Sequence, residues 1–116
     1  MATLRTPQTE QAYKEHRNQK PADAGCALCD KESLKSFKHW KIIENAFPYD
    51  KIAAVHHMVV PLRHATEAEL SADEYAELDE LKDGVLNDDY EYIIEATHKT
   101  KSIPGHFHLH LIVAKE

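Results

Sequence analysis

The chain has 116 residues, of which 42% are hydrophobic and 29% are charged, a composition that suits one compact domain with one core. Its net charge of -6 at pH 7 argues against broad binding to nucleic-acid polymers, which requires a basic surface, although a small nucleotide needs only a local pocket rich in donors. No apolar run approaches the roughly 20 residues of a membrane span, and the N-terminus lacks an apolar signal core, so we expect a cytoplasmic protein with no membrane partner.

The first half of the chain predicts one helix and two strands. The helix is polar and lies on the surface, and Pro21 ends it. A loop with a Cys-x-x-Cys pair, Cys26 and Cys29, follows this helix. Both predicted strands are rich in apolar, β-branched or aromatic residues, and turn-forming residues separate them. The ranges are 6–20 for the helix, 37–44 and 54–61 for the strands, and 45–50 for the turn.

The second half predicts a longer helix and two more strands. Ser71 is a typical N-cap residue for a helix over residues 72–86. Strands are expected over residues 89–96 and 106–114. The apolar residues at helical spacing, which should form the buried stripe of the helix, are Tyr75, Leu78, Leu81 and Val85. This order predicts an α+β fold in which an antiparallel sheet has a helix between its two strand pairs, after an N-terminal helix.

Residues 105–113 read GHFHLHLIV, in which three histidines alternate with apolar residues. Successive side chains of a strand point to opposite faces, so His106, His108 and His110 should share one face. The apolar side chains between and after them should enter the core; they are Phe107, Leu109, Leu111 and Val113. Three interpretations are open: a solvated face that carries histidines by chance, a metal site, or an active site built on a strand.

This string resembles the signature of the histidine-triad, or HIT, superfamily of nucleotide hydrolases and transferases. Its context strengthens the resemblance. Residues 45–64, NAFPYDKIAAVHHMVVPLRH, are similar to the family's Asn-containing turn, its upstream histidine and its strand that ends in Pro-x-x-His. The Cys-x-x-Cys pair stands where many members carry one. The resemblance covers residues 26–113 and implies the HIT-like α+β fold and chemistry at a phosphorus centre.

The resemblance also implies a role for three histidines. His108, the middle residue of the triad, would be the nucleophile toward the α-phosphate, and its covalent nucleotidyl-histidine intermediate divides one hard displacement into two easier ones. His110, on the same face, would stabilise charge on the phosphoryl oxygens. His56 stands at the position of the family's upstream active-site histidine, whereas the adjacent His57 should point to the opposite face.

The candidate phosphate-binding residues depart from the family pattern. Members usually have Gly-Gln-Ser or Gly-Gln-Thr before the triad, but residues 101–105 read KSIPG, in which Pro104 has no N–H to donate. Lys101 could supply a positive charge, and Ser102 a hydroxyl and an amide. Asn45 is a candidate for contacting ribose hydroxyls, although an asparagine in a turn needs no ligand. The Asn-x-x-Pro turn is also similar to that of nucleotidylyltransferases of the galactose-1-phosphate uridylyltransferase type.

Four residues are candidates for a structural zinc site. Cys26 and Cys29 supply two thiolates, and His64 and His106 could complete a closed Cys2His2 set. Zinc-containing HIT members resemble this chain in drawing on the same four places. Such a metal would join the N-terminal segment to the sheet and orient the neighbour of His106. Two buried free thiols or a redox pair are the alternative interpretations of the cysteines.

We therefore expect a single HIT-like domain over residues 1–116, with an N-terminal helix and loop over 1–25 and the core over 26–116. The expected function is a hydrolase or nucleotidyltransferase that acts on a small-molecule nucleotide, and the resemblance implies a homodimer. Two alternatives are a non-catalytic, nucleotide-binding regulatory module and a metal-dependent hydrolase that uses the strand histidines as ligands. The identity of the base and of the leaving group is left open.

Overall fold

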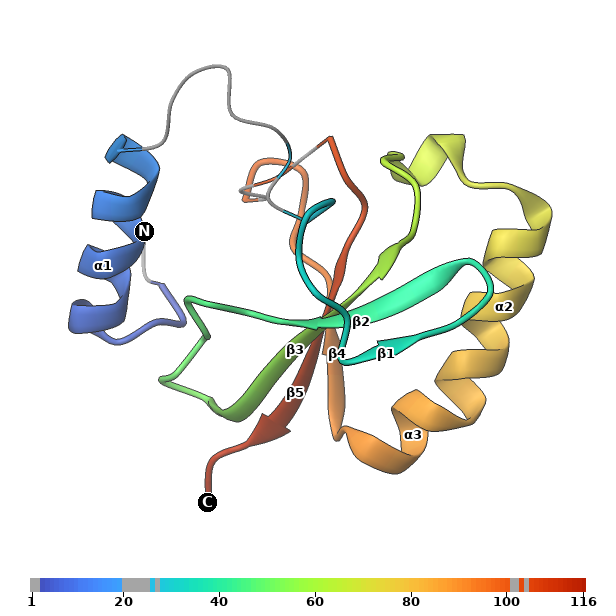
Figure 1. The fold of residues 1–116 in the computed structure, drawn as a ribbon. Coiled ribbons are helices and arrows are strands. Elements are labelled where there is room, and N and C mark those ends of the chain that lie inside the picture. Colours follow the sequence, from blue (N-terminus) through green and yellow to red (C-terminus); the bar gives the residue numbers. More distant parts are fainter. Residues whose placement is uncertain (1–2, 20–25, 27, 101–102, 104) are drawn as a thin grey trace.

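A computed structural model of the chain describes residues 3–19, 26, 28–100, 103 and 105–116 (Figure 1). An antiparallel sheet of five strands stands between the N-terminal helix on one side and the later helices on the other. In chain order the elements are α1 (Pro7–Gln19), β1 (Lys35–Ser36), β2 (Trp40–Glu44), β3 (Ala53–Pro61), a 3-10 turn η1 (Glu67–Glu69), α2 (Ala72–Asp83), α3 (Val85–Asp89), β4 (Tyr92–Ile94) and β5 (Leu109–Ala114).

The strand order in the sheet is β1-β2-β3-β5-β4, so the two longest strands, β3 and β5, are neighbours at its centre. Their register places Met58 opposite His110 and Val59 opposite Leu109. Directly opposed residues of an antiparallel pair point to the same face. The register therefore places the side chains of His56, Met58 and His110 on one face of the sheet and those of His57, Val59 and Leu109 on the other.

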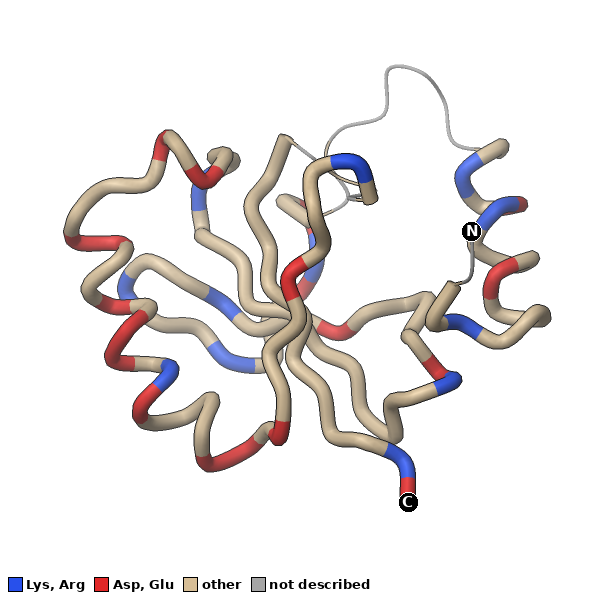
Figure 2. The backbone as a smooth tube through the Cα atoms, turned by 180° about the vertical axis from the view of Figure 1, so that it is seen from behind, with Lys and Arg blue, Asp and Glu red and all other residues tan. Residues whose placement is uncertain are grey.

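The face that carries Val59 and Leu109 packs against α2 and α3 and forms the larger core. Leu78 and Leu81 of α2 and Leu86 of α3 meet the sheet there, together with Trp40. The indole Nε1–H of Trp40 donates to the backbone carbonyl of Glu74 at 2.8 Å, which satisfies the one polar atom of this buried ring. Figure 2 shows that acidic residues follow one another along α2 and α3, so much of the negative charge lies on this side of the sheet.

The opposite face of the sheet, which carries the side chains of His56, Met58 and His110, has a smaller core. Ile43, Met58 and Val60 of the sheet pack there against Leu28, which lies between the two cysteines in sequence. Cys26 and Ile103 pack at the edge of the same cluster. The histidine face is therefore covered by the segment that carries the cysteines.

The fold class predicted from the sequence is confirmed, but several element boundaries are different. The last strand begins at Leu109 instead of at residue 106, because β3 ends at Pro61 and the Phe107 amide donates instead to the carbonyl of Ala65 at 2.7 Å. The strand expected over 89–96 is limited to β4. The strand expected over 37–44 begins at Trp40, since residues 37–39 turn the chain between β2 and the short, polar β1, which the sequence analysis missed.

The predicted helix over residues 72–86 is divided at Gly84 into α2 and α3, and its buried stripe is partly different from the expected one. Tyr75 is 40% exposed, and its hydroxyl donates to the carbonyl of Glu67. Glu74 is buried in its place, and Val85 and Val113 are only partly buried. A carboxylate can occupy this position because the Arg63 guanidinium donates to it, and this bond lowers the pKa of Glu74 to about 2.

Ser71 caps α2 as expected. Its side chain accepts a hydrogen bond from the Glu74 amide at 3.2 Å, and the Glu74 carboxylate accepts from the Ser71 amide at 2.8 Å. This reciprocal pair is a capping box. Among the described residues, no helix has the length and apolar content that crossing a membrane requires.

Candidate functional site

The three histidines of the triad are all buried, with exposed fractions of 0% for His106 and 4% for both His108 and His110. The interpretation of these residues as a solvated face that carries histidines by chance is therefore wrong. His110 belongs to β5, whereas His106 and His108 lie in the segment just before it. The three rings have different partners, which divides the triad into separate environments.

The contact of the His108 ring with the backbone of His106 defines which ring nitrogen of His108 carries the proton. Its Nδ1 lies 2.9 Å from the carbonyl oxygen of His106, and a carbonyl can only accept. Nδ1 therefore carries the hydrogen in the neutral ring, and Nε2 carries the lone pair. An imidazole in this tautomer is prepared for nucleophilic attack through Nε2.

His56, His110 and Tyr49 form a closed ring of hydrogen bonds. The Tyr49 backbone N–H donates to Nδ1 of His56 at 2.9 Å, so a neutral His56 must carry its hydrogen on Nε2. That Nε2–H donates to Nδ1 of His110 at 2.8 Å, and Nε2 of His110 in turn lies 3.3 Å from the Tyr49 hydroxyl. One backbone amide thus determines the tautomers of both histidines.

Both imidazoles in this ring are neutral at pH 7. Burial, supported by the positive charge of Arg5 and by the neighbouring histidines, lowers the pKa of His56 to about 4 and that of His110 to about 3. Protonating Nδ1 of His56 would also place a hydrogen against the Tyr49 amide. At neutral pH, His110 therefore has a single N–H, on Nε2, and this N–H lies 3.3 Å from the Tyr49 hydroxyl.

His57 takes the opposite face of β3. Its Nδ1 lies 2.6 Å from the hydroxyl of Tyr90, next to the larger core. Burial raises the pKa of Tyr90 to about 12, so the phenol keeps its hydrogen at neutral pH. Of the adjacent pair, His56 is the residue that lies beside the triad.

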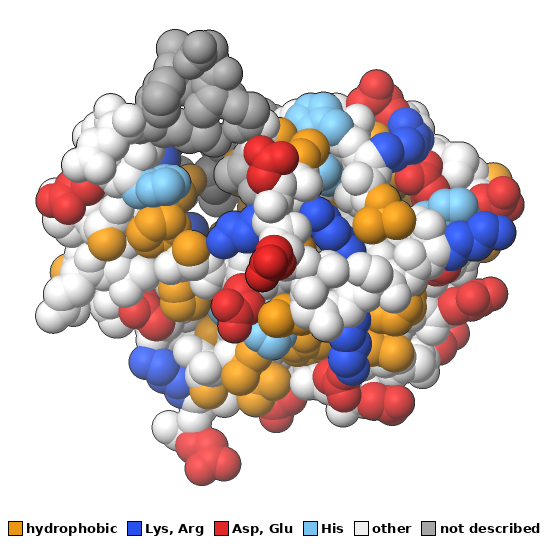
Figure 3. Space-filling model, in the orientation of Figure 1, with side chains coloured by type: hydrophobic (Ala, Val, Ile, Leu, Met, Phe, Trp, Pro, Cys, Tyr) orange, Lys and Arg blue, Asp and Glu red, His pale blue; other side chains and the backbone are white. Residues whose placement is uncertain are grey.

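A cavity of about 370 Å³ opens beside the triad. His108 and His110 line it from the sheet side, and α1 with its preceding residues lines it from the other. Figure 3 shows this hollow between α1, at the left, and the centre of the molecule. Its other described lining residues are Arg5, Tyr13, His16, Leu28, Lys31, Asn45, Ala46, Phe47, Met58 and Ile103.

The predicted phosphate- and ribose-binding residues have different outcomes. Asn45 lines the cavity, and its Oδ1 accepts from the Phe47 amide at 2.8 Å, which shapes the turn after β2. Its Nδ2 lies 3.4 Å from Nε2 of His56 and 3.8 Å from the sulfur of Met58. Lys101 and Ser102 lie outside the residues that the structure describes.

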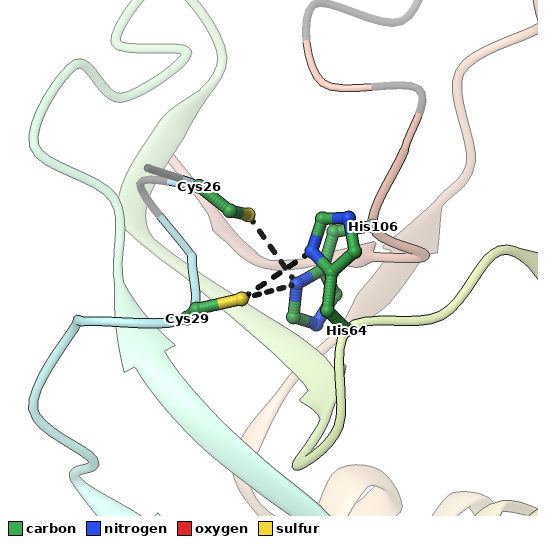
Figure 4. A group of neighbouring side chains, drawn as sticks. All are labelled: Cys26, Cys29, His64 and His106. Atoms are coloured by element: carbon green, nitrogen blue, oxygen red, sulfur yellow. Dashed lines mark hydrogen bonds between the residues drawn. The ribbon is translucent and has the colours of Figure 1, made fainter. Parts of the chain in front are cut away.

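The four predicted zinc ligands come together from three separate segments of the chain. Cys26 and Cys29 approach from the loop before β1, His64 from the segment after β3, and His106 from the segment before β5 (Figure 4). One ligand atom from each lies within 4.8 Å of all the others. The structure thus groups one triad histidine with the cysteines and another with His56.

Three of the distances between the donor atoms suit a tetrahedral ion of the size of zinc. Nδ1 of His106 lies 3.4 Å from both sulfurs, and Nδ1 of His64 lies 3.3 Å from the sulfur of Cys29. Tetrahedral Zn–S and Zn–N bonds separate neighbouring donors by roughly 3.3 to 3.8 Å. Nε2 of His106 donates to the carbonyl of Pro61 at 3.1 Å, which leaves the Nδ1 lone pair directed at the cysteines.

Lys41 supports the loop that carries the cysteines. It is 9% exposed, and its ammonium donates to the carbonyls of Cys29 and Lys31 at 3.3 and 3.0 Å. Its charge lies close enough to the Cys29 thiol to favour the thiolate, although burial and the nearby Cys26 raise the pKa of Cys29 overall. This buried lysine had no signal in the sequence beyond its place in a strand.

Sequence reasoning missed the contribution of the N-terminal segment to the cavity. Arg5, Tyr13 and His16 all line it, although the resemblance begins only at Cys26. The polar composition of α1 indicated a surface helix, and α1 has no buried residue. The bond from the Tyr49 backbone amide to His56 could not be inferred from residue type either.

Comparisons with known proteins agree on the fold. No family model matches the chain, and no curated protein matches it. Among solved structures, it is similar to a HIT family hydrolase from Legionella pneumophila Philadelphia 1, with a TM-score of 0.54 and 16% identity over 79% of this chain and 95% of that one. It is also similar to a histidine triad protein from Clostridium difficile, with a TM-score of 0.53 and 15% identity over 84% of this chain and 95% of that one. The chain therefore has the histidine-triad fold.

Proposed function

We propose that this protein is a nucleotide hydrolase or nucleotidyltransferase that acts at the α-phosphate of a small-molecule nucleotide through a covalent intermediate on His108. The observation that carries this proposal is the tautomer of His108, whose Nδ1–H donates to the His106 carbonyl at 2.9 Å. The lone pair is then on Nε2, and the residue lines the cavity. The solved proteins with this fold include one described as a HIT family hydrolase.

In the first step, Nε2 of His108 attacks phosphorus, and the bond to the leaving group breaks, with the electron pair going to the leaving group. In the second step, water or another hydroxyl displaces the imidazole and restores His108. The Nε2–H of His110 would exchange its 3.3 Å contact with the Tyr49 hydroxyl for a phosphoryl oxygen and stabilise the charge there. His56 would hold His110 through the 2.8 Å bond to its Nδ1. Asn45 would contact the ribose.

We further propose that Cys26, Cys29, His64 and His106 hold one zinc ion. Four protein ligands leave no open position, so the ion would be structural and would supply no reacting group. Its effect on the reaction would be positional. His106 is held through Nδ1 by the metal and through Nε2 by Pro61, and its carbonyl orients His108.

The test begins with a screen of adenosine, guanosine and uridine phosphoramidates, dinucleoside polyphosphates and nucleotide sugars. On the substrate found, His108→Ala should lower the rate of the chemical step by several orders of magnitude while nucleotide affinity changes much less. His110→Ala should cost on the order of 10²-fold, as for the loss of one oxyanion donor. His98→Ala, which changes an exposed histidine of a loop, is the matched control.

Mass spectrometry after a rapid quench should find a nucleotidyl group on the peptide that contains residues 106–110, and only when His108 is present. Wild-type turnover by His108→Ala, or inversion at phosphorus, would overturn the covalent mechanism. A nucleotide that binds but is never cleaved would instead support a regulatory binding module. Loss of rate on chelation without loss of folding would support the metal-dependent hydrolase.

A further inference from the structure

The N-terminal segment is held firmly against the turn between β2 and β3, beside the triad. The Thr6 amide donates to Asp50 at 2.7 Å, and the Lys51 amide donates to the carbonyl of Leu4 at 3.0 Å. The hydroxyl of Thr9 also donates to the Asp50 carboxylate, and these bonds lower the pKa of Asp50. Figure 1 shows α1, in blue, as a separate layer on this side of the sheet.

This arrangement inserts Arg5 between α1 and the site. Its side chain is 11% exposed, and its guanidinium carbon lies 4.2 Å from the centre of the Tyr13 ring and 5.1 Å from that of Tyr49. Nε donates to the Phe47 carbonyl at 2.7 Å, and Nη1 lies 3.4 Å from Glu10. A guanidinium has five N–H donors, and within the described part of the chain these two acceptors occupy two of them.

The charge of the cavity wall is opposite to that of the whole chain. Arg5 and Lys31 are cations, and none of the described lining residues is Asp or Glu, although the net charge of the protein is -6. Figure 3 shows blue side chains beside the hollow, while Figure 2 shows the acidic residues of α2 and α3 on the other side of the sheet. Such a wall matches an anionic ligand.

We propose that Arg5 binds the phosphate group of the nucleotide and thereby completes, from outside the HIT-like core, the anion site of the proposed function on which this inference rests. A guanidinium fork can donate two parallel hydrogen bonds to phosphate oxygens. It would add donors on the side of the cavity that faces α1, opposite the histidines. The N-terminal segment is then part of the active site and not only a surface helix.

A purely structural role for Arg5, in which it only holds α1 to the turn, is the alternative. The bond to the Phe47 carbonyl and the stacking on Tyr13 support that role. However, the positive charge of Arg5 also acts on His56 and His110 and opposes their protonation. Glu10, at 3.4 Å, offsets part of this charge from the far side, and an anion in the cavity would offset the rest.

Isothermal titration calorimetry with AMP, GMP and UMP, each against its nucleoside, separates the two roles. In the wild type, one nucleotide should bind more tightly than its nucleoside. Arg5→Gln should lower the affinity for that nucleotide by tenfold to a hundredfold and leave the affinity for its nucleoside within about twofold. Arg5→Lys, which keeps the charge without the fork, should retain part of the preference. Arg17→Gln is the matched control, because Arg17 also stacks on Tyr13, at 5.6 Å, but does not line the cavity.

Each other outcome overturns a defined part of this inference. Equal loss of nucleotide and nucleoside affinity in Arg5→Gln would mean that α1 has moved, so that Arg5 is structural; Asp50→Asn, which weakens the contact with Thr6 without changing Arg5, should then have the same effect. If Arg5→Gln still prefers the nucleotide over its nucleoside as strongly as the wild type does, Arg5 is excluded as a phosphate ligand, and the proposed function is unaffected. A wild-type protein with no preference for the nucleotide over the nucleoside would overturn the proposed function and this inference together.

Discussion

Among single residues, the buried pair His56 and His110 should make the stability of the protein depend on pH. Both are neutral in the folded state, with lowered pKa values, whereas histidines in the unfolded chain bind protons near pH 6.5. Between these values the unfolded state binds more protons, so acid favours unfolding. The contribution of the pair is complete above about pH 7 and is lost as the pH falls toward 4.

We therefore expect the urea midpoint of unfolding to decrease steadily from pH 7.5 to pH 5. His110→Gln should flatten this slope, because it removes one of the two groups that must stay unprotonated. His98→Gln, in an exposed loop, should leave the slope unchanged. A slope that is the same in His110→Gln and the wild type would contradict the neutral pair.

Residue types and spacing could predict which side chains meet, but not how their protons are arranged. The alternation of residues 106–110 follows from the period of a strand, which also means that only one of His56 and His57 can face the site. The family resemblance indicated His56. The tautomers follow from two backbone groups, the Tyr49 amide and the His106 carbonyl. Backbone groups carry no sequence signal, so these contacts required the structure.

At the scale of elements, Glu74 joins the start of α2 to the segment after β3. Its carboxylate accepts hydrogen bonds from the Ser71 amide and from Arg63, at 2.8 Å each, and is 4% exposed as a residue. An amide at this place would lose the charge and direct N–H groups at a donor. Glu74→Gln should therefore lower the free energy of unfolding by about 1 to 2 kcal/mol.

The matched control for this variant is Glu80→Gln, which changes an exposed carboxylate of the same helix. Urea denaturation followed by circular dichroism at pH 7 should show almost no change for the control. The difference between the two variants should shrink below pH 4, as the pKa of Glu74 near 2 is approached from above. Equal destabilisation by both variants would contradict the role of Glu74.

The elements themselves could be predicted well where the pattern was long. β3 and the start of α2 agree with the sequence analysis because the valines of β3, with Pro61 at its end, and an N-cap serine are local signals. The burial of Glu74 could not be predicted, since it depends on Arg63. The division at Gly84 follows a local signal, the low helix propensity of glycine, which the sequence analysis did not use. The residues at which β4 and β5 begin and end depend on how far the neighbouring strand continues, so these boundaries could not be predicted from the sequence of either strand.

At the scale of the whole molecule, the proposed metal should connect three segments of the chain and stabilise all of it. Purified protein should contain about one zinc per chain. Cys26→Ser should lower the metal content and reduce the thermal midpoint on the order of 10 °C, and chelation of the wild type should act in the same direction. Zinc analysis by mass spectrometry and differential scanning calorimetry measure the two effects.

His39→Ala, which changes a histidine outside the cluster, is the control and should keep both zinc and midpoint. Full metal occupancy in the double variant Cys26→Ser, Cys29→Ser would exclude these residues as ligands. Their convergence could be predicted only with the family resemblance, because the cluster joins residues 80 positions apart. The contribution of α1 to the cavity could not be predicted, since that segment has no counterpart in the resemblance.

The central pairing of β3 with β5 also has a consequence for folding. β2 and β3 are joined by a short turn, but the contact between His56 and His110 links residues 54 positions apart. Closing so long a loop is entropically costly and is repaid only when the strands pair, so such contacts form slowly. A folding intermediate held together by the local hairpin would have His56 and Tyr49 in place and lack His110. Assembly of the histidine ring therefore requires the long-range pairing of β3 with β5 and cannot be completed within the local hairpin.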